Sequence, residues 1–231
     1  MTHAAGATPR RLACLKIELR FTVTGRARFL SHLECVDGLL AAFRRAGFPV
    51  APSNGMRPKP VISLAVARAV GIASQDELMT VDLVGDHDPE DVRERLAATL
   101  PRGLEVRSAA VSEGTPRPVS ARYRVTLDAP RDVVERAAAR YAEVEAQPVE
   151  RASPKRRKIV DVKAFAPVVE VAEGGFDVEV AISQEGSARP EEVARALAEL
   201  AGADLAVTGV SRLELRVERG RTPVGAPGET A

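Results

Sequence analysis

Residues 29–63 read FLSHLECVDGLLAAFRRAGFPVAPSNGMRPKPVIS, which predicts a capped helix followed by a proline-rich loop. Ser31 is placed to cap the helix, and Glu34, three residues later, can complete a capping box. Apolar residues recur at the spacing of one buried helical face, namely Leu33, Val36, Leu39, Leu40 and Phe43. Gly47 supplies a stop signal. The sequence therefore predicts a helix over residues 31–46.

The loop that follows, residues 53–60, cannot be regular structure. Its two prolines remove backbone donors and hold their neighbours in extended conformations. Arg57 and Lys59 bring positive charge, while Asn54 and Gly55 can form a turn that exposes backbone N–H groups. The loop is therefore predicted to be rigid and cationic.

We expect the start of the helix and this loop to meet in one anion pocket. Ser31 and His32 stand at the helix N-terminus, where free N–H groups favour anions. Arg57 and Lys59 would face them from the loop. The alternative is a rigid surface loop that only connects two strands.

The same residues resemble a bacterial family signature. Residues 28–33 match its R-F-L-S-H-L motif, with Glu34 in place of an aspartate, and residues 44–50 match its R-R-A-G-x-P-V motif. The loop fits at Ser53, Gly55, Pro58, Pro60, Ile62 and Ser63, but it lacks the histidine of the common pattern. The stretch is similar to the radical-SAM-linked proteins, a family of unknown function of the DUF2344 type. This resemblance implies a separate radical-SAM partner.

The cysteine content shows that this chain is not itself the radical enzyme. Such an enzyme holds its iron–sulfur cluster with three closely spaced cysteines, whereas this chain has only Cys14 and Cys35. Two cysteines fit a reducing compartment. We expect a cytoplasmic protein without a cofactor.

Composition excludes several other classes. The net charge of +1 gives no global field for nucleic acid or membrane, so any basic surface is local. Aromatic residues make up 3% and tryptophan is absent, which argues against base-stacking platforms. No apolar run approaches the roughly 18 residues of a membrane span, and the first ten residues lack the core of a signal peptide.

The predicted elements follow the order β-α-β-β-α-β two times in succession, which indicates an α+β fold of two tandem ferredoxin-like units. In the first unit the strands are 15–23, 50 with 61–65, 79–83 and 104–108, and the helices are 31–46 and 88–100. In the second the strands or extended segments are 123–127, 159–171, 176–182 and 213–217, and the helices are 131–145 and 190–201.

The predicted boundaries follow from composition. Residues 1–11 and 219–231 read as disordered tails, and 113–120 (EGTPRPVS) as a linker between units at 12–112 and 121–218. Three helices open with proline and acidic residues, which favours internal duplication, although many helices begin this way.

Two arrangements near the helix start could carry other chemistry. His32 and Cys35 share a helical face, but a zinc site needs three or four converging ligands, so no metal is expected. Ser31 beside His32 suggests a nucleophile and a base, but Ser31 is already committed as a cap. His32 alone could serve as general acid or base on an RNA phosphodiester. A structural hydrogen-bonding role is the simpler interpretation.

A second basic element is the run Lys155, Arg156, Arg157 and Lys158. It could contact an RNA backbone without sequence preference. It could equally be a solvated edge that blocks strand pairing.

We therefore predict a non-catalytic binding protein that contacts RNA or another anionic ligand and acts with a separate radical-SAM or RNA-processing enzyme. One alternative is an RNA-processing endoribonuclease that uses His32, by fold-level analogy with CRISPR RNA-processing enzymes. Another is a pure protein-docking domain in which the basic residues are incidental.

Overall fold

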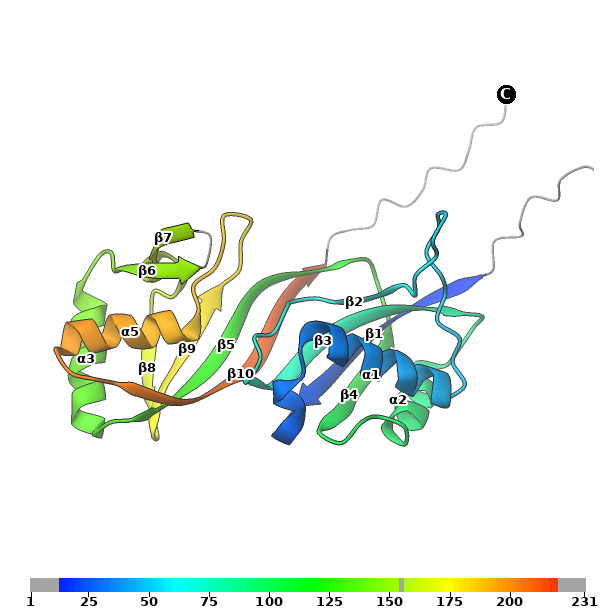
Figure 1. Cartoon of the computed structure of the whole chain (residues 1–231), viewed down its shortest axis with the longest axis horizontal. Helices are drawn as coiled ribbons and strands as arrows, with labels where there is room; N and C mark the ends of the chain where they lie inside the picture. The colour runs from blue at the N-terminus through cyan, green and yellow to red at the C-terminus, as the bar shows by residue number, and fades with distance from the viewer. Residues whose placement is uncertain (1–12, 154–155, 220–231) are drawn as a thin grey trace, which may run out of the picture.

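The computed structural model describes residues 13–153 and 156–219 and shows a mixed α+β protein (Figure 1). The elements of the first half are β1 (Cys14–Val23), the 3-10 helix η1 (Gly25–Phe29), α1 (His32–Arg45), β2 (Ile62–Leu64), β3 (Ala73–Val84), α2 (Pro89–Ala97) and β4 (Leu104–Val111). Those of the second half are β5 (Pro116–Asp128), α3 (Arg131–Glu143), β6 (Pro148–Ser153), β7 (Arg156–Asp161), α4 (Val162–Phe165), β8 (Val169–Ala172), β9 (Gly175–Ala181), α5 (Pro190–Ala201) and β10 (Ala206–Arg219).

One large sheet runs through both halves of the chain. Its strand order is β4-β1-β3-β10-β5-β9-β8, with β2 also paired to β3, and β6 and β7 form a separate two-stranded sheet. The pairings between its strands are antiparallel except for a short parallel contact of β10 with β3. The predicted α+β class is confirmed, and the two halves share one continuous sheet.

The first core lies between the sheet and the helices of the first half. Alternate residues of β1 are buried, namely Ile17, Leu19, Phe21 and Val23. Leu39 and Phe43 of α1 and Val92 and Leu96 of α2 belong to the same cluster. The alternation in the sequence is that of a strand with one face packed in this core, while the opposite face carries polar residues, of which Glu18 is itself buried.

The buried face of α1 differs from the predicted one at its first turn. Leu33 was expected in the core but is 73% exposed, whereas Cys35 is buried. Leu33 precedes Cys35 by two residues, which places it about 200° around the helix and on the opposite face. The buried face is centred on Cys35, Leu39, Ala42 and Phe43.

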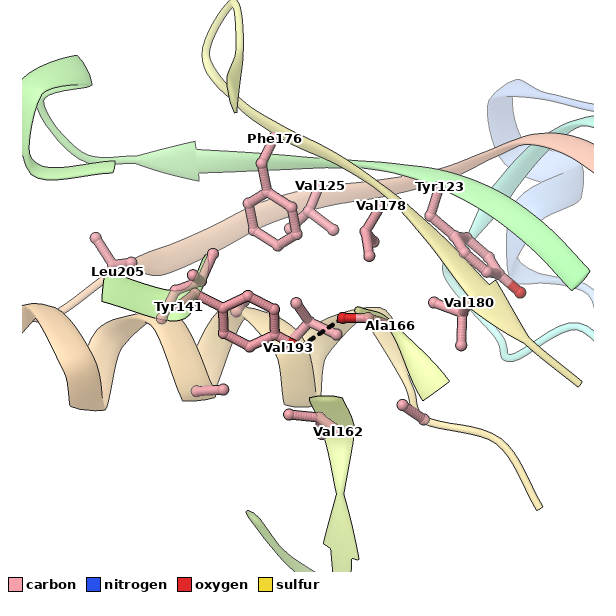
Figure 2. Packing of buried hydrophobic residues seen from close by; sticks show 14 of the residues in the cluster. Tyr123, Val125, Tyr141, Val162, Ala166, Phe176, Val178, Val180, Val193 and Leu205 are labelled. Atoms are coloured by element: carbon pink, nitrogen blue, oxygen red, sulfur yellow. Dashed lines mark hydrogen bonds between the residues drawn. The ribbon is translucent and has the colours of Figure 1, made fainter. Parts of the chain in front are cut away.

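The second core lies between β5, β9 and the helices α3 and α5. Figure 2 shows Val125 of β5, Phe176 and Val178 of β9, and Val193 of α5 meeting there. Within this core the hydroxyl of Tyr141 donates to the carbonyl oxygen of Ala166 at 2.7 Å, drawn as a dashed line. Burial raises the pKa of this phenol, so it remains a hydrogen-bond donor.

Several predicted elements differ from the structure in extent. The hairpin of β6 and β7 was not predicted, and α4 interrupts the expected extended segment 159–171. β5 begins at Pro116, so part of the predicted linker 113–120 is strand. The predicted tails lie outside the described residues apart from Arg219, which ends β10. No helix within residues 13–153 and 156–219 is long and apolar enough to cross a membrane.

β3 begins at Ala73, six residues before the predicted strand. Its early part carries Ser74, Asp76 and Glu77, which are buried although polar. Buried polar residues break the apolar alternation by which a strand is recognised. Their partners come from distant parts of the chain, as described below.

Candidate functional site

The N-terminus of α1 forms the capping box that the sequence predicts. The Ser31 hydroxyl accepts from the Glu34 N–H at 3.3 Å, and the Ser31 N–H donates to Oε2 of Glu34 at 2.8 Å. Hydrogen bonding of the Glu34 carboxyl to the Ser31 side chain, and then to the Ser31 N–H, lowers the pKa of that carboxyl. A carboxylate therefore already occupies this helix end, and an incoming anion would have to displace it.

His32 is exposed and lines a narrow crevice with Cys35, Arg68 and Glu77. The crevice has a volume of about 10 Å³, and a cavity needs roughly that much to admit a single water. It is too small for a ligand group in this conformation.

Residues 52–60 form a protruding turn, which we call the proline hairpin. Pro52 and Pro60 bridge at its base, the Ser53 N–H donates to the Lys59 carbonyl at 2.7 Å, and the Lys59 N–H donates to the Ser53 hydroxyl at 3.0 Å. The residues at its tip, Asn54, Gly55, Met56, Arg57, Pro58 and Lys59, are all exposed. Hydrogen bonds between Ser53 and Lys59 hold the base of the loop in place, and the loop is cationic, as predicted.

The structure does not bring the proline hairpin to His32. The segment before the hairpin is anchored by the Ala51 N–H to the Asp82 carbonyl, and Asp82 pairs with Lys16 at the far end of β1 from Val23. α1 has 14 residues, a length of about 21 Å, and Figure 1 shows the hairpin rising beyond its C-terminal end. Arg57 and Lys59 therefore share no pocket with Ser31 and His32.

The second predicted basic element lies on the hairpin of β6 and β7, here called the β6–β7 arm. Arg157 and Lys158 are exposed, and Arg157 forms an ion pair with Glu150 at 3.2 Å. Arg156 begins β7, and Lys155 lies outside the described residues. Figure 1 shows the arm and the proline hairpin on the same long edge of the molecule.

A cleft lies between the two halves and was not predicted. We call it the inter-half cleft. It has a volume of about 820 Å³. Its walls come from the segment 66–72 and from residues 182–195, and Tyr123 and Arg212 also line it. Five arginines and two glutamates line it, namely Arg68, Arg151, Arg189, Arg195, Arg212, Glu191 and Glu192. The cleft thus carries an excess of positive charge.

Arg68 is fixed by main-chain oxygens. Its guanidinium donates to the carbonyls of Arg28 at 2.7 Å, Leu30 at 3.2 Å and Ile72 at 2.6 Å, and more weakly to that of Ala69. These bonds attach the wall segment 66–72 to the segment before α1. In the described part of the chain, no carboxylate forms an ion pair with Arg68. Burial lowers its pKa, against the opposing attraction of Glu77.

Arg151 and Glu192 form a neutral, locked pair in the opposite wall. The guanidinium reaches both carboxylate oxygens, at 2.5 and 2.6 Å, and also the Ser187 carbonyl at 2.8 Å. The Arg189 N–H adds a bond to Glu192 at 2.9 Å. Burial opposes charge on Glu192, but Arg151 and this N–H outweigh it and lower the pKa of the carboxyl.

Arg212 is buried beside Glu77 and Tyr123. Its Nη1 lies 2.8 Å from Oε1 of Glu77, and it donates to the Tyr123 hydroxyl from Nε at 3.3 Å and Nη2 at 3.2 Å. Burial raises the pKa of Glu77, while Arg212 attracts the charged form. Each charge in this group therefore has a partner, and the Glu77–Arg212 pair joins β3 to β10 beside the cleft.

Arg189 and Arg195 remain as exposed cations at the rim. Arg195 donates to the Glu150 carbonyl at 2.9 Å. In the chain as described, neither side chain is paired with a carboxylate. Among the described residues, no three or more His, Cys, Asp or Glu side chains are arranged so that they could hold a metal ion.

The fold and these surfaces define an α+β protein with an arginine-lined cleft and two cationic hairpins. The chain belongs to the DUF2344 family, described as an uncharacterized protein conserved in bacteria, whose family model matches residues 16–190. No curated protein matches the sequence. One solved structure that matches, an unknown protein from Galdieria sulphuraria, is 16% identical, with 89% of this chain and 99% of that chain covered and a TM-score of 0.28. That TM-score is too low to support an inference.

Proposed function

We propose that the chain is a non-catalytic module that binds the phosphate backbone of RNA and acts with a separate enzyme. The observation that carries this proposal is a set of exposed cations on one long edge of the molecule. Arg57 and Lys59 stand on the proline hairpin and Lys158 on the β6–β7 arm, without a carboxylate partner in the part of the chain that the structure describes.

Cations at the tips of hairpins suit a backbone ligand. Each phosphate contact releases condensed counterions, so binding depends on charge and on salt and not on base identity. With aromatic residues at 3% and no tryptophan, the chain offers few stacking groups. We therefore expect sequence-independent affinity.

We further infer that the two halves are tandem ferredoxin-like units. In the first half β4-β1-β3 is continued by β2, and in the second the order is β10-β5-β9-β8. Both orders are those expected of a β-α-β-β-α-β unit, and the β6–β7 arm with α4 is then an insertion before β8. The partner is proposed from the resemblance to radical-SAM-linked proteins and is a radical-SAM or RNA-processing enzyme.

Salt-dependent RNA binding tests this function. The double change Arg57→Ala with Lys59→Ala should flatten the plot of log affinity against log salt by roughly two units if both side chains contact phosphate. Lys158→Ala should remove roughly one further unit. Folding should change by about 0.5 kcal/mol or less per site, since these residues are exposed.

The matched control is Arg131→Ala with Arg136→Ala, two exposed arginines of α3 that pair with acids on their own helix. This control should leave the salt slope unchanged. An unchanged slope in the Arg57 and Lys59 variant would overturn the proposal and favour protein docking as the role of this edge.

A further inference from the structure

The inter-half cleft has the dimensions of a small-molecule site. Its volume of about 820 Å³ lies within the range of roughly 300–1,000 Å³ typical of ligand pockets. Part of its lining is apolar, from Val66, Ile72, Ile182 and Ala188. Such a lining suits the body of an organic ligand and not a free inorganic ion.

The charges in the cleft specify an anion. Arg151 and Arg212 are neutralised by Glu192 and Glu77. Arg68, Arg189 and Arg195 line the same cleft and form no ion pair with a described carboxylate, and with Glu191 as the remaining acid the lining keeps an excess of positive charge. Arginine is suited to phosphate because its planar fork can donate two parallel hydrogen bonds.

Arg68 is oriented before any ligand arrives. Its bonds to the carbonyls of Arg28, Leu30 and Ile72 use Nη1 and Nη2. Within the described residues no acceptor takes its Nε–H. Binding an anion there would cost little side-chain entropy, because the guanidinium is already fixed.

We infer that the inter-half cleft binds a phosphomonoester on an organic body of nucleotide size. The phosphate, which carries close to two negative charges near pH 7, would lie among Arg68, Arg189 and Arg195. The body would lie against the apolar wall that includes Ile72 and Ile182. This site shares Arg151 with the β6–β7 arm, but its phosphate contacts use none of the hairpin cations Arg57, Lys59 and Lys158, so it does not depend on RNA-backbone binding.

Two sources could supply this chemistry, a free nucleotide or the phosphorylated end of an RNA. Calorimetric titration of the full chain with AMP, with adenosine and with inorganic phosphate tests the first. A short oligonucleotide, with and without a terminal phosphate, tests the second. We expect binding to require both the phosphate and the organic body, so adenosine and inorganic phosphate should each bind at least tenfold more weakly than AMP or the phosphorylated oligonucleotide, by about the energy of one charge-assisted hydrogen bond.

Variants at the rim test the assignment without disturbing the buried pairs. Arg189→Ala with Arg195→Ala should weaken binding of the phosphorylated probe by about tenfold or more. The corresponding double change to lysine should recover part of that loss, because lysine restores the positive charge but cannot donate the two parallel hydrogen bonds of a guanidinium. Glu191→Gln should strengthen binding, since it removes an exposed negative charge from the cleft lining.

Arg131→Ala with Arg136→Ala again serves as control and should have no effect. Equal binding of phosphorylated and unphosphorylated probes would overturn the inference, and so would an unchanged affinity in the Arg189 and Arg195 variant. Failure here leaves the salt slope of the hairpin variants untouched, so the two proposals fail separately.

Discussion

Glu77 on β3 and Arg212 on β10 form an ion pair of 2.8 Å in which the two side chains are only 3% and 2% exposed. The parallel contact of these strands is limited to Ser211 with Ala73 and Arg212 with Ser74. A second bond crosses nearby, from the Leu215 N–H to Asp76 at 2.8 Å. Buried polar contacts therefore supplement a short stretch of strand pairing where the two halves meet.

Removing one member of this pair should be costly. Arg212→Ala leaves Glu77 buried without its cation, and loss of one partner of a buried ion pair costs about 3–5 kcal/mol. The measurement is the free energy of unfolding by urea denaturation. The Tyr123 hydroxyl also loses a donor in this variant.

The double variant Arg212→Met with Glu77→Leu separates burial of a charge from loss of packing. We expect it to be more stable than Arg212→Ala, because apolar residues of similar volume replace buried pairs at little net cost. If the double variant unfolded as readily as the single one, the cost would lie in packing, and the pair would not be the cause.

Glu192 should make folding sensitive to acid. Its pKa is lowered in the folded protein, so the unfolded chain binds a proton at higher pH than the folded chain does. The contribution of ionised Glu192 to folding stability is complete above about pH 5. It is lost as the pH falls through the pKa of glutamate in the unfolded chain, near 4.3, and on through the lower pKa of the folded protein.

Glu192→Gln should therefore flatten the dependence of unfolding free energy on pH between about pH 5 and pH 3. The exposed neighbour Glu191 provides the control change, Glu191→Gln, which should leave that slope nearly intact. If the unfolding free energy of the Glu192 variant depended on pH as steeply as that of the wild type, the acid sensitivity would come from other carboxylates. Asp177 is one such group, because its hydrogen bonds with Arg124 also lower its pKa.

Local patterns predicted most elements of this fold. The helix bounds 190–201 and the stop at Gly202 were correct, because a proline start and a residue of φ 63° at the end are encoded locally. The early part of β3 was missed because Asp76 and Glu77 are satisfied by Arg20 and Arg212, which are far away in sequence. Pairing at such separation leaves no local signal.

The candidate site was less predictable than the fold. The cations of the proline hairpin could be identified because they stand on one rigid loop. The cleft arginines come from positions between 68 and 212, and they meet where the two halves join, at the pairing of β10 with β3 and the buried Glu77–Arg212 ion pair. The expected meeting of His32 with Arg57 failed because α1 separates them along its length.

The cap of α1 provides a prediction that separates stability from binding. Ser31→Ala removes the acceptor for the Glu34 N–H and should cost about 1 kcal/mol of unfolding free energy. RNA affinity should not change, since Ser31 lies at the opposite end of α1 from the proline hairpin. Loss of affinity at an unchanged melting temperature would instead make Ser31 a ligand contact.

His32 decides between a binding module and an RNA endonuclease. Its side chain is exposed, and the crevice beside it has a volume of only about 10 Å³, so this crevice cannot hold a phosphodiester in place. A general acid or base must lie within hydrogen-bond reach of its proton-transfer partner, about 3 Å between heavy atoms or one water away. We therefore expect the wild-type protein to leave a labelled RNA intact, and His32→Ala to change RNA affinity only modestly.

The assay follows both cleavage and binding of the same labelled RNA, with His32→Gln as a companion that keeps a hydrogen-bonding side chain. General acid–base catalysis contributes about 10²–10⁴-fold in rate, so a catalytic His32 would give an unmistakable difference. Cleavage by the wild type that both variants lose at unchanged affinity would establish an enzyme and refute the binding module. Intact RNA in all three proteins, with affinity governed by Arg57 and Lys59, is the result that the binding module predicts.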